Sequence, residues 1–182
     1  MRLSSETHLV FYQSLQMRRA IGLVVLLAVA FGAAAADFRG QVVGVTDGDT
    51  IHVLVDGHDR VTVRLAGIDA PEKAQPFGSV SKKHLSEKVF SREVTVESTK
   101  RDKYGRVIGR VLADDEDVCM DQVRTGLAWH YKLYASEQSA SQRSAYAAAE
   151  KQARQEESGL WSQPNPVPPW EFRRSERSAR GK

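Results

Sequence analysis

The sequence predicts an α+β domain built on a small antiparallel β-barrel or sheet. Two observations predict this class: short runs of β-forming residues come first, and apolar residues with helical spacing follow them. Hydrophobic residues make up 41% of the 182-residue chain and charged residues 27%, which are ordinary values for a globular protein. The chain is therefore suited to folding around one core.

Three strands open the predicted domain. They cover Phe38–Thr46, Thr50–Val55 and Arg60–Ala66, and the last run alternates polar and apolar residues as a half-buried strand does. Asp56–Asp59 (DGHD) joins the second strand to the third and carries a hairpin turn signal. We expect the three strands to form a meander.

A helix, two more strands and two further helices complete the pattern. The first helix and the strand pair are predicted at Gly78–Phe90, Glu93–Thr99 and Arg106–Leu112. Cys119, Val123 and Leu127 then recur every four residues, which predicts a helix ending at or just after Gly126. Because Cys119 shares this apolar stripe, we interpret it as a buried structural thiol. An alanine-rich helix is predicted at Glu137–Glu157.

The pattern of residues 1–36 predicts a secretory signal peptide. Ala20–Ala36 carries no charge, follows two arginines and ends in small residues, as a cleavable signal does. Its 17 residues fall short of the roughly 20 that span a bilayer as a helix. We expect cleavage after Ala36 and a secreted or periplasmic protein. An uncleaved anchor is the alternative reading, and Met17 is an alternative start of translation.

The composition of the C-terminal residues predicts a disordered tail. Four prolines crowd between Pro164 and Pro169, and Glu171–Lys182 is charged and poor in apolar residues. We expect residues 163–182 to be Pro-rich and then basic and disordered, and residues 37–162 to form the folded domain. The net charge of +3 comes from the two ends, since residues 37–170 carry a net −2. The basic pI alone is therefore weak support for a nucleic-acid partner.

Acidic residues and one arginine gather at the strand ends. Asp49 follows the first strand, Arg64 lies on the third, and Asp69 and Glu72 come just after it. In a meander the first turn and the end of the third strand are neighbours, so these side chains should converge. Carboxylates with a backbone carbonyl suit Ca²⁺ or Mg²⁺, and a guanidinium suits phosphate. Taken singly, Asp47–Thr50 (DGDT) is also a common turn.

Other chemistries lack their patterns. A single Cys excludes an internal disulfide and a multi-Cys zinc site, and the histidines have no zinc-like spacing. Asp114–Asp117 lacks the glycine and the final Glu of an EF-hand loop, so we interpret it as a solvated hairpin turn. Trp129, Tyr131 and Tyr134 could stack on bases, but the place of Trp129 after Gly126 favours a core role for it.

Three segments resemble the signature segments of the staphylococcal nuclease (thermonuclease) family. They are Asp47–Thr50 (DGDT), Arg64–Glu72 (RLAGIDAPE) and Asp102–Arg106 (DKYGR), in the family's order and at its intervals. The resemblance extends over about residues 38–161. It implies a five-stranded antiparallel OB-type β-barrel with three helices, and Ca²⁺ as the cofactor.

The resemblance also implies roles for individual residues. The metal ligands correspond to Asp49, Asp69 and the backbone carbonyl of Ala70. The general base corresponds to Glu72, and the two arginines around the scissile phosphate correspond to Arg64 and Arg106. The substrate-binding positions correspond to Lys103, Tyr104 and Tyr134. Ala70 keeps the carbonyl but lacks a hydroxyl group that the family's best-known member has. Two features depart from the family pattern: Lys132 stands where a pocket tyrosine is expected, and the segment after Glu72 is shorter than the long flexible loop of that member.

The implied function is Ca²⁺-dependent hydrolysis of DNA and RNA by in-line attack of water, leaving 3′-phosphate ends. The alternative is a non-catalytic nucleic-acid-binding module of the same fold. A calcium-stabilised structural domain would leave Arg64 and Arg106 without a role. We expect a monomer that acts on nucleic acid, with no stable protein partner and no membrane attachment after signal cleavage.

Overall fold

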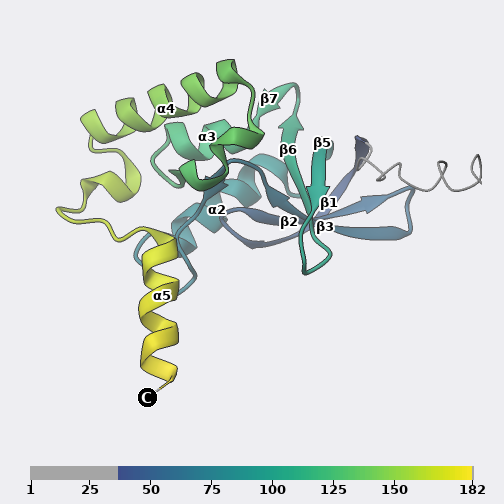
Figure 1. The fold of residues 1–182 in the computed structure, drawn as a ribbon. Helices are drawn as coiled ribbons and strands as arrows, with labels where there is room; N and C mark the ends of the chain where they lie inside the picture. The colour runs from purple at the N-terminus through teal and green to yellow at the C-terminus, as the bar shows by residue number, and fades with distance from the viewer. Residues whose placement is uncertain (1–36, 182) are drawn as a thin grey trace, which may run out of the picture. The chain divides into compact units, whose positions relative to one another are not determined.

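Five strands close into a barrel in the computed structural model, which describes residues 37–181 (Figure 1). In chain order these strands are β1 Phe38–Asp47, β2 Thr50–Val55, β3 Asp59–Leu65, β5 Glu93–Arg101 and β6 Val107–Ala113. Their order around the barrel is β3-β2-β1-β5-β6, and β3 also pairs with β6. Register shifts in the pairings of β1 and β5 mark irregularities that help strands bend around a small barrel.

The pair that closes the barrel corrects one part of the predicted fold. The other four barrel pairs are antiparallel, but β3 and β6 run parallel, with Val63 opposite Val107 and Leu65 opposite Gly109. An odd number of strands cannot alternate in direction all the way around a closed barrel, so one pair must be parallel. The OB-type five-stranded barrel is confirmed, and the purely antiparallel description is wrong.

Side-chain alternation fills the barrel as the sequence predicted. Ile51, Val53, Val63 and Leu65 of β2 and β3 are at most 1% exposed, and the residues between them are less buried or polar. The thiol of Cys119 is also fully buried, and burial raises its pKa to about 12. Cys119 is therefore a core residue and not a nucleophile.

Helices cover the barrel in the order that was predicted. Their bounds are α2 Gly78–Val89, α3 Val118–Arg124 and α4 Ala140–Gln155, and α3 packs against both of the others (Figure 1). The predicted start of the last helix at Glu137 is too early. A 3-10 turn, η1 (Lys132–Glu137), comes first, and α4 begins only after Ser139, which forms a capping box with Gln142.

Short strands and a second 3-10 turn connect these elements. The pairs are β4 (Ile68–Asp69) with β8 (Trp129–His130), and β6 with β7 (Glu116–Asp117). The residues expected to form a solvated hairpin turn therefore do turn at Asp114 and Asp115, and then pair briefly before α3. The second 3-10 turn is η2 (Gly159–Ser162).

The C-terminal segment folds, and the prediction of a disordered tail is wrong. Pro169–Arg180 forms a further helix, α5, with proline in its first turn, where the missing N–H costs nothing. Trp170 stacks on Tyr131 with ring centroids 5.3 Å apart and meets Trp129 edge-on at 5.5 Å. This aromatic cluster, which confirms the core role of Trp129, anchors the start of α5.

The predicted signal peptide, residues 1–36, lies outside the described residues, so its cleavage stays a prediction. Among residues 37–181, no helix is both long and apolar enough to cross a bilayer.

One buried carboxylate makes stability depend on pH. Asp121 of α3 accepts from His84 at 2.8 Å and from Arg124 at 2.6 Å, and Lys88 lies 3.4 Å away. These partners hold the pKa of Asp121 below its usual value, with the His84 hydrogen bond contributing most. A depressed carboxylate pKa stabilises the fold above the unfolded-state value of about 4 and loses that contribution as the pH falls further.

We therefore expect Asp121→Asn to destabilise the protein at pH 7 by about 1.5–3 kcal/mol, because the hydrogen bonds involve charged groups. Urea unfolding between pH 7 and pH 2.5 should show this difference shrinking below about pH 4. Asp114→Asn is the matched control, since Asp114 pairs with Arg92 at an exposed surface. A difference for Asp121→Asn that does not change with pH would contradict the account.

Candidate active site

The turn between β1 and β2 holds Asp49 in a fixed position. The Asp49 N–H donates to the Asp47 carboxylate at 3.1 Å, which shapes the turn. The fully buried Gln122 of α3 donates to the carbonyl of Gly48 at 2.6 Å. A Cβ on Gly48 would lie 1.9 Å from the hydroxyl of Ser81 on α2. The turn therefore packs directly against two helices.

We expect Gly48→Ala to destabilise the fold by about 1–3 kcal/mol and to lower any activity that depends on Asp49, because the turn must move away from α2. Thermal unfolding checks the stability. Adding Ser81→Ala removes the closest clashing atom, so the double variant should recover part of the loss. A double variant no more stable than Gly48→Ala would argue against this contact as the cause.

Arg64 bridges the two carboxylates that the sequence expected to converge. One of its terminal nitrogens lies 2.7 Å from the Asp49 carboxylate, and the other lies 2.8 Å from that of Asp69. The N–H of Ala70 donates to Asp49 at 2.7 Å, so the peptide that follows Asp69 joins the same group. The topology makes this possible because β3 pairs with β2 beside the Asp49 turn and leads into β4.

Both carboxylates are buried beside charged neighbours. The side chain of Asp69 is 1% exposed and that of Asp49 is 8% exposed. Burial raises the pKa of Asp49 to about 7, although Arg64 acts in the opposite direction and Asp47 and Asp69 add to the rise. Burial also opposes the charge of Arg64, but its two carboxylate partners outweigh this and raise its pKa. The surroundings of Asp49 thus disfavour its ionised form.

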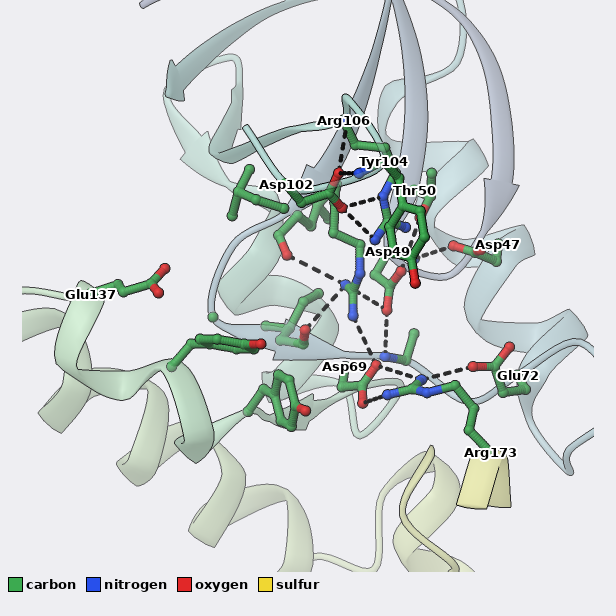
Figure 2. Close-up of a pocket in the computed structure, with 18 of the residues that line it drawn as sticks. Asp47, Asp49, Thr50, Asp69, Glu72, Asp102, Tyr104, Arg106, Glu137 and Arg173 are labelled. Carbon is green, nitrogen blue, oxygen red and sulfur yellow. Dashed lines mark hydrogen bonds and ion pairs between the residues drawn. The ribbon is translucent and has the colours of Figure 1, made fainter. Parts of the chain in front are cut away.

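Glu72 is connected to Asp69 through Arg173, a residue near the C-terminus. Figure 2 shows the side chain of Arg173 between Glu72 and Asp69. Its guanidinium donates to Glu72 at 2.7 Å and to the two oxygens of Asp69 at 3.2 and 2.8 Å. Gln75 accepts from the Glu72 N–H at 2.9 Å, which fixes the backbone of this loop.

Arg106 approaches the group from the β5–β6 turn. Its Nε donates to Asp102 at 2.8 Å, and the same carboxylate accepts from the backbone N–H groups of Tyr104 and Arg106. Slight burial opposes ionisation of Asp102, yet the Arg106 hydrogen bond and its neighbours hold its pKa below the usual value. Lys103 and Arg106 both lie over the ring of Tyr104. Asp102 therefore orients the turn that carries the predicted substrate-binding residues.

The position of Lys132 explains its departure from the family pattern. Its amine pairs with the buried Glu150 at 2.5 Å and is not among the residues lining the pocket. The preceding residue, Tyr131, lines the pocket instead, with its ring centroid 5.2 Å from that of Tyr134. Two aromatic rings thus stand at this wall, and both belong to residues that the sequence indicated could stack on bases.

All the site residues predicted from the sequence line one pocket of about 750 Å³. They are Asp49, Arg64, Asp69, Ala70, Glu72, Lys103, Tyr104, Arg106 and Tyr134. Tyr131, which the sequence indicated as a residue that could stack on bases, also lines the pocket. No site role was predicted for several other lining residues, among them Asp102, Arg173 and Arg177. Helical spacing after Pro168-Pro169 was a usable signal for the last two, because Trp170, Arg173 and Arg177 recur at intervals of three and four.

The atoms that are available as metal ligands indicate which cation could bind. Within residues 37–181, no cluster of three or more His, Cys, Asp or Glu side chains is arranged to hold a metal ion. Asp49 and Asp69 offer buried carboxylate oxygens, and the Ala70 peptide lies beside them because its N–H donates to Asp49. Such a set fits a hard cation that completes its shell with water or phosphate, as Ca²⁺ and Mg²⁺ do.

The barrel and its pocket define an OB-type domain with buried carboxylates and arginines arranged around one open site. The family model described as "Staphylococcal nuclease homologue" matches residues 62–163. The chain belongs to this staphylococcal nuclease family, as the three sequence segments predicted.

Relatives extend the similarity over most of the chain. It is 41% identical over 170 residues to "Micrococcal nuclease" of Shigella flexneri, covering 88% of this chain and 94% of that protein. It is 41% identical over 158 residues to an "Uncharacterized endonuclease" of Escherichia coli, covering 86% of this chain and 98% of that protein. "Protein ParB" of Escherichia coli is 38% identical over 177 residues, with 92% and 97% covered.

Proposed function

We propose that this chain is a Ca²⁺-dependent nuclease that hydrolyses phosphodiester bonds of DNA and RNA. The names of the relatives, a micrococcal nuclease and endonucleases, support the nuclease activity. The observation that carries the proposal is that Asp49, Asp69 and Glu72 meet Arg64 and Arg106 in one pocket. A pocket that only bound nucleic acid would have no use for three acidic groups, because they repel phosphate.

Asp49, Asp69 and the Ala70 carbonyl would hold the cation. When bound, Ca²⁺ would neutralise charge on the phosphodiester and polarise one of its oxygens. The all-oxygen donors would suit Ca²⁺ or Mg²⁺, and we assign Ca²⁺ on the resemblance to the staphylococcal nuclease family.

The chain's own residues perform the remaining steps. Glu72 takes a proton from a water molecule as the water oxygen bonds to phosphorus and the bond from phosphorus to the 5′ oxygen breaks. Arg64 and Arg106 donate hydrogen bonds to the phosphoryl oxygens on which negative charge grows. Asp102 holds Arg106 for this role. The departing 5′ oxygen takes up a proton from solvent, so the products are a 3′-phosphate end and a free 5′-hydroxyl.

Tyr104, Tyr131 and Tyr134 supply surfaces on which bases can stack, and Lys103 adds positive charge beside Tyr104. Such contacts tolerate any base, so we propose little sequence preference. We further propose that the mature protein is a secreted or periplasmic monomer, on the strength of its signal-like residues 1–36.

Digestion of denatured DNA with and without EGTA tests the function. We expect degradation in Ca²⁺, none in EGTA, and recovery when Ca²⁺ is restored. Equal degradation in both conditions would contradict the calcium requirement. No degradation in either would favour the non-catalytic binding module, and end-labelling of any products would identify which side of the phosphodiester is cut.

A further inference from the structure

The guanidinium of Arg173, on α5, lies against the carboxylates of Asp69 and Glu72 in the pocket. It contacts both carboxylate oxygens of Asp69, one of which also accepts from Arg64. It also contacts Glu72 at 2.7 Å. Two guanidiniums thus surround Asp69, and a bidentate arginine is a strong partner for a carboxylate. A cation that bound Asp69 in this arrangement would lie beside two guanidinium charges, which repel it.

The start of α5 is anchored so that Arg173 points at the carboxylates. Trp170 lies against Tyr131 and Trp129, and Arg173 follows it by three residues on the same helical face. Before the helix, Gln75 donates to the Val167 carbonyl at 3.0 Å while it also holds the backbone of Glu72. The helix and the Glu72 loop are therefore connected by both packing and hydrogen bonds.

Beyond Arg173 the helix has little to hold it. In α5 only Pro169 is buried, and Arg174 on the same turn as Arg173 is exposed. Burial opposes the charge of Arg173, but Asp69 and Glu72 outweigh it and raise its pKa, so the group stays charged at every physiological pH. The contact is thus an ion-pair latch on a helix that the rest of the fold holds only at its beginning.

We infer that α5 is an autoinhibitory latch: Arg173 competes with the metal ion for Asp69 and withholds Glu72 until the metal displaces it. This inference rests on the proposed metal site. A competitor that belongs to the chain lowers the apparent affinity for the metal by the fraction of molecules in which the latch is open. The protein therefore needs more Ca²⁺ to become active than its ligands alone require.

Calcium titration of the full-length, metal-free protein by isothermal titration calorimetry tests the latch. Arg173→Gln removes the competing charge, and Arg174→Gln removes the same charge from the same turn without touching the pocket. A chain ending at Phe172 keeps the Trp170 anchor and removes the rest of α5. Binding is measured without nucleic acid, so the result does not depend on activity.

We expect Arg173→Gln and the shortened chain to bind Ca²⁺ about 10-fold more tightly than the unchanged protein, which corresponds to a latch open in about one molecule in ten. Arg174→Gln should change affinity by less than about 2-fold, as a screened surface charge does. Calcium binding that is measurable but equal in the Arg173 and Arg174 variants would overturn the latch alone. If no variant binds Ca²⁺, the proposed metal site fails and the latch with it.

Discussion

Replacing Glu72 with glutamine is expected to lower kcat by about 10²–10⁴-fold, because an amide cannot accept the proton of the attacking water. The substitution keeps the size of the side chain and removes its charge. Affinity for a single-stranded oligonucleotide should change by less than about 3-fold, since the loss falls on the transition state and not on the ground state. Steady-state kinetics and fluorescence anisotropy measure the two effects separately.

Glu137→Gln is the matched control for this experiment. Glu137 lines the same pocket, but its carboxylate is paired with Lys100 at 2.5 Å, away from Asp49 and Asp69. We expect its kcat to stay within about 3-fold of the unchanged protein, as a surface charge without a catalytic role should. A large loss of binding with normal turnover in Glu72→Gln would contradict the role of general base.

Replacing Arg64 with glutamine is expected to lower kcat by about 10²–10³-fold at saturating Ca²⁺, the usual effect of removing one donor to a developing negative charge. It should also cost about 3–5 kcal/mol of stability without Ca²⁺, because the side chains of Asp49 and Asp69 are at most 8% exposed and lose their shared partner. Calcium should restore much of that loss by supplying the missing positive charge.

The two effects are separated by measuring thermal unfolding and cleavage on the same samples. Calcium should raise the Tm of Arg64→Gln by more than it raises that of the unchanged protein. Arg60→Gln, on the same strand but exposed, is the control and should change neither quantity appreciably. If Arg64→Gln is as stable as the control without Ca²⁺, the bridge between the carboxylates contributes little.

The part of the site that sequence reasoning predicted depends on local topology. Asp49, Arg64 and Asp69 converge because a meander brings its first turn beside the end of its third strand, and the strand patterns were clear. A closed barrel with five strands requires a parallel pair, but that this pair is β3 with β6 depends on residues far apart in the chain, such as Val63 and Val107.

The part of the site that was not predicted depends on contacts that the amino-acid composition does not reveal. The segment after Pro169 looks disordered because it is rich in charge, yet Trp170 anchors it and Arg173 finds carboxylates about 100 positions earlier in the chain. Lys132 stands where a pocket tyrosine was expected, and it turns away from the pocket because the buried Glu150 that pairs with it lies on a different helix. Such pairings follow from tertiary packing and not from local pattern.

Metal-assisted cleavage is tested by the single-turnover cleavage rate of one defined single-stranded DNA as free Ca²⁺ is varied. Asp69→Asn is compared with the unchanged protein. We expect a rate that rises to saturation with Ca²⁺ in the unchanged protein and stays near background in the variant at the same concentrations. Cleavage that is independent of Ca²⁺, or a full rate in Asp69→Asn, would contradict a metal-assisted nuclease centred on this pocket.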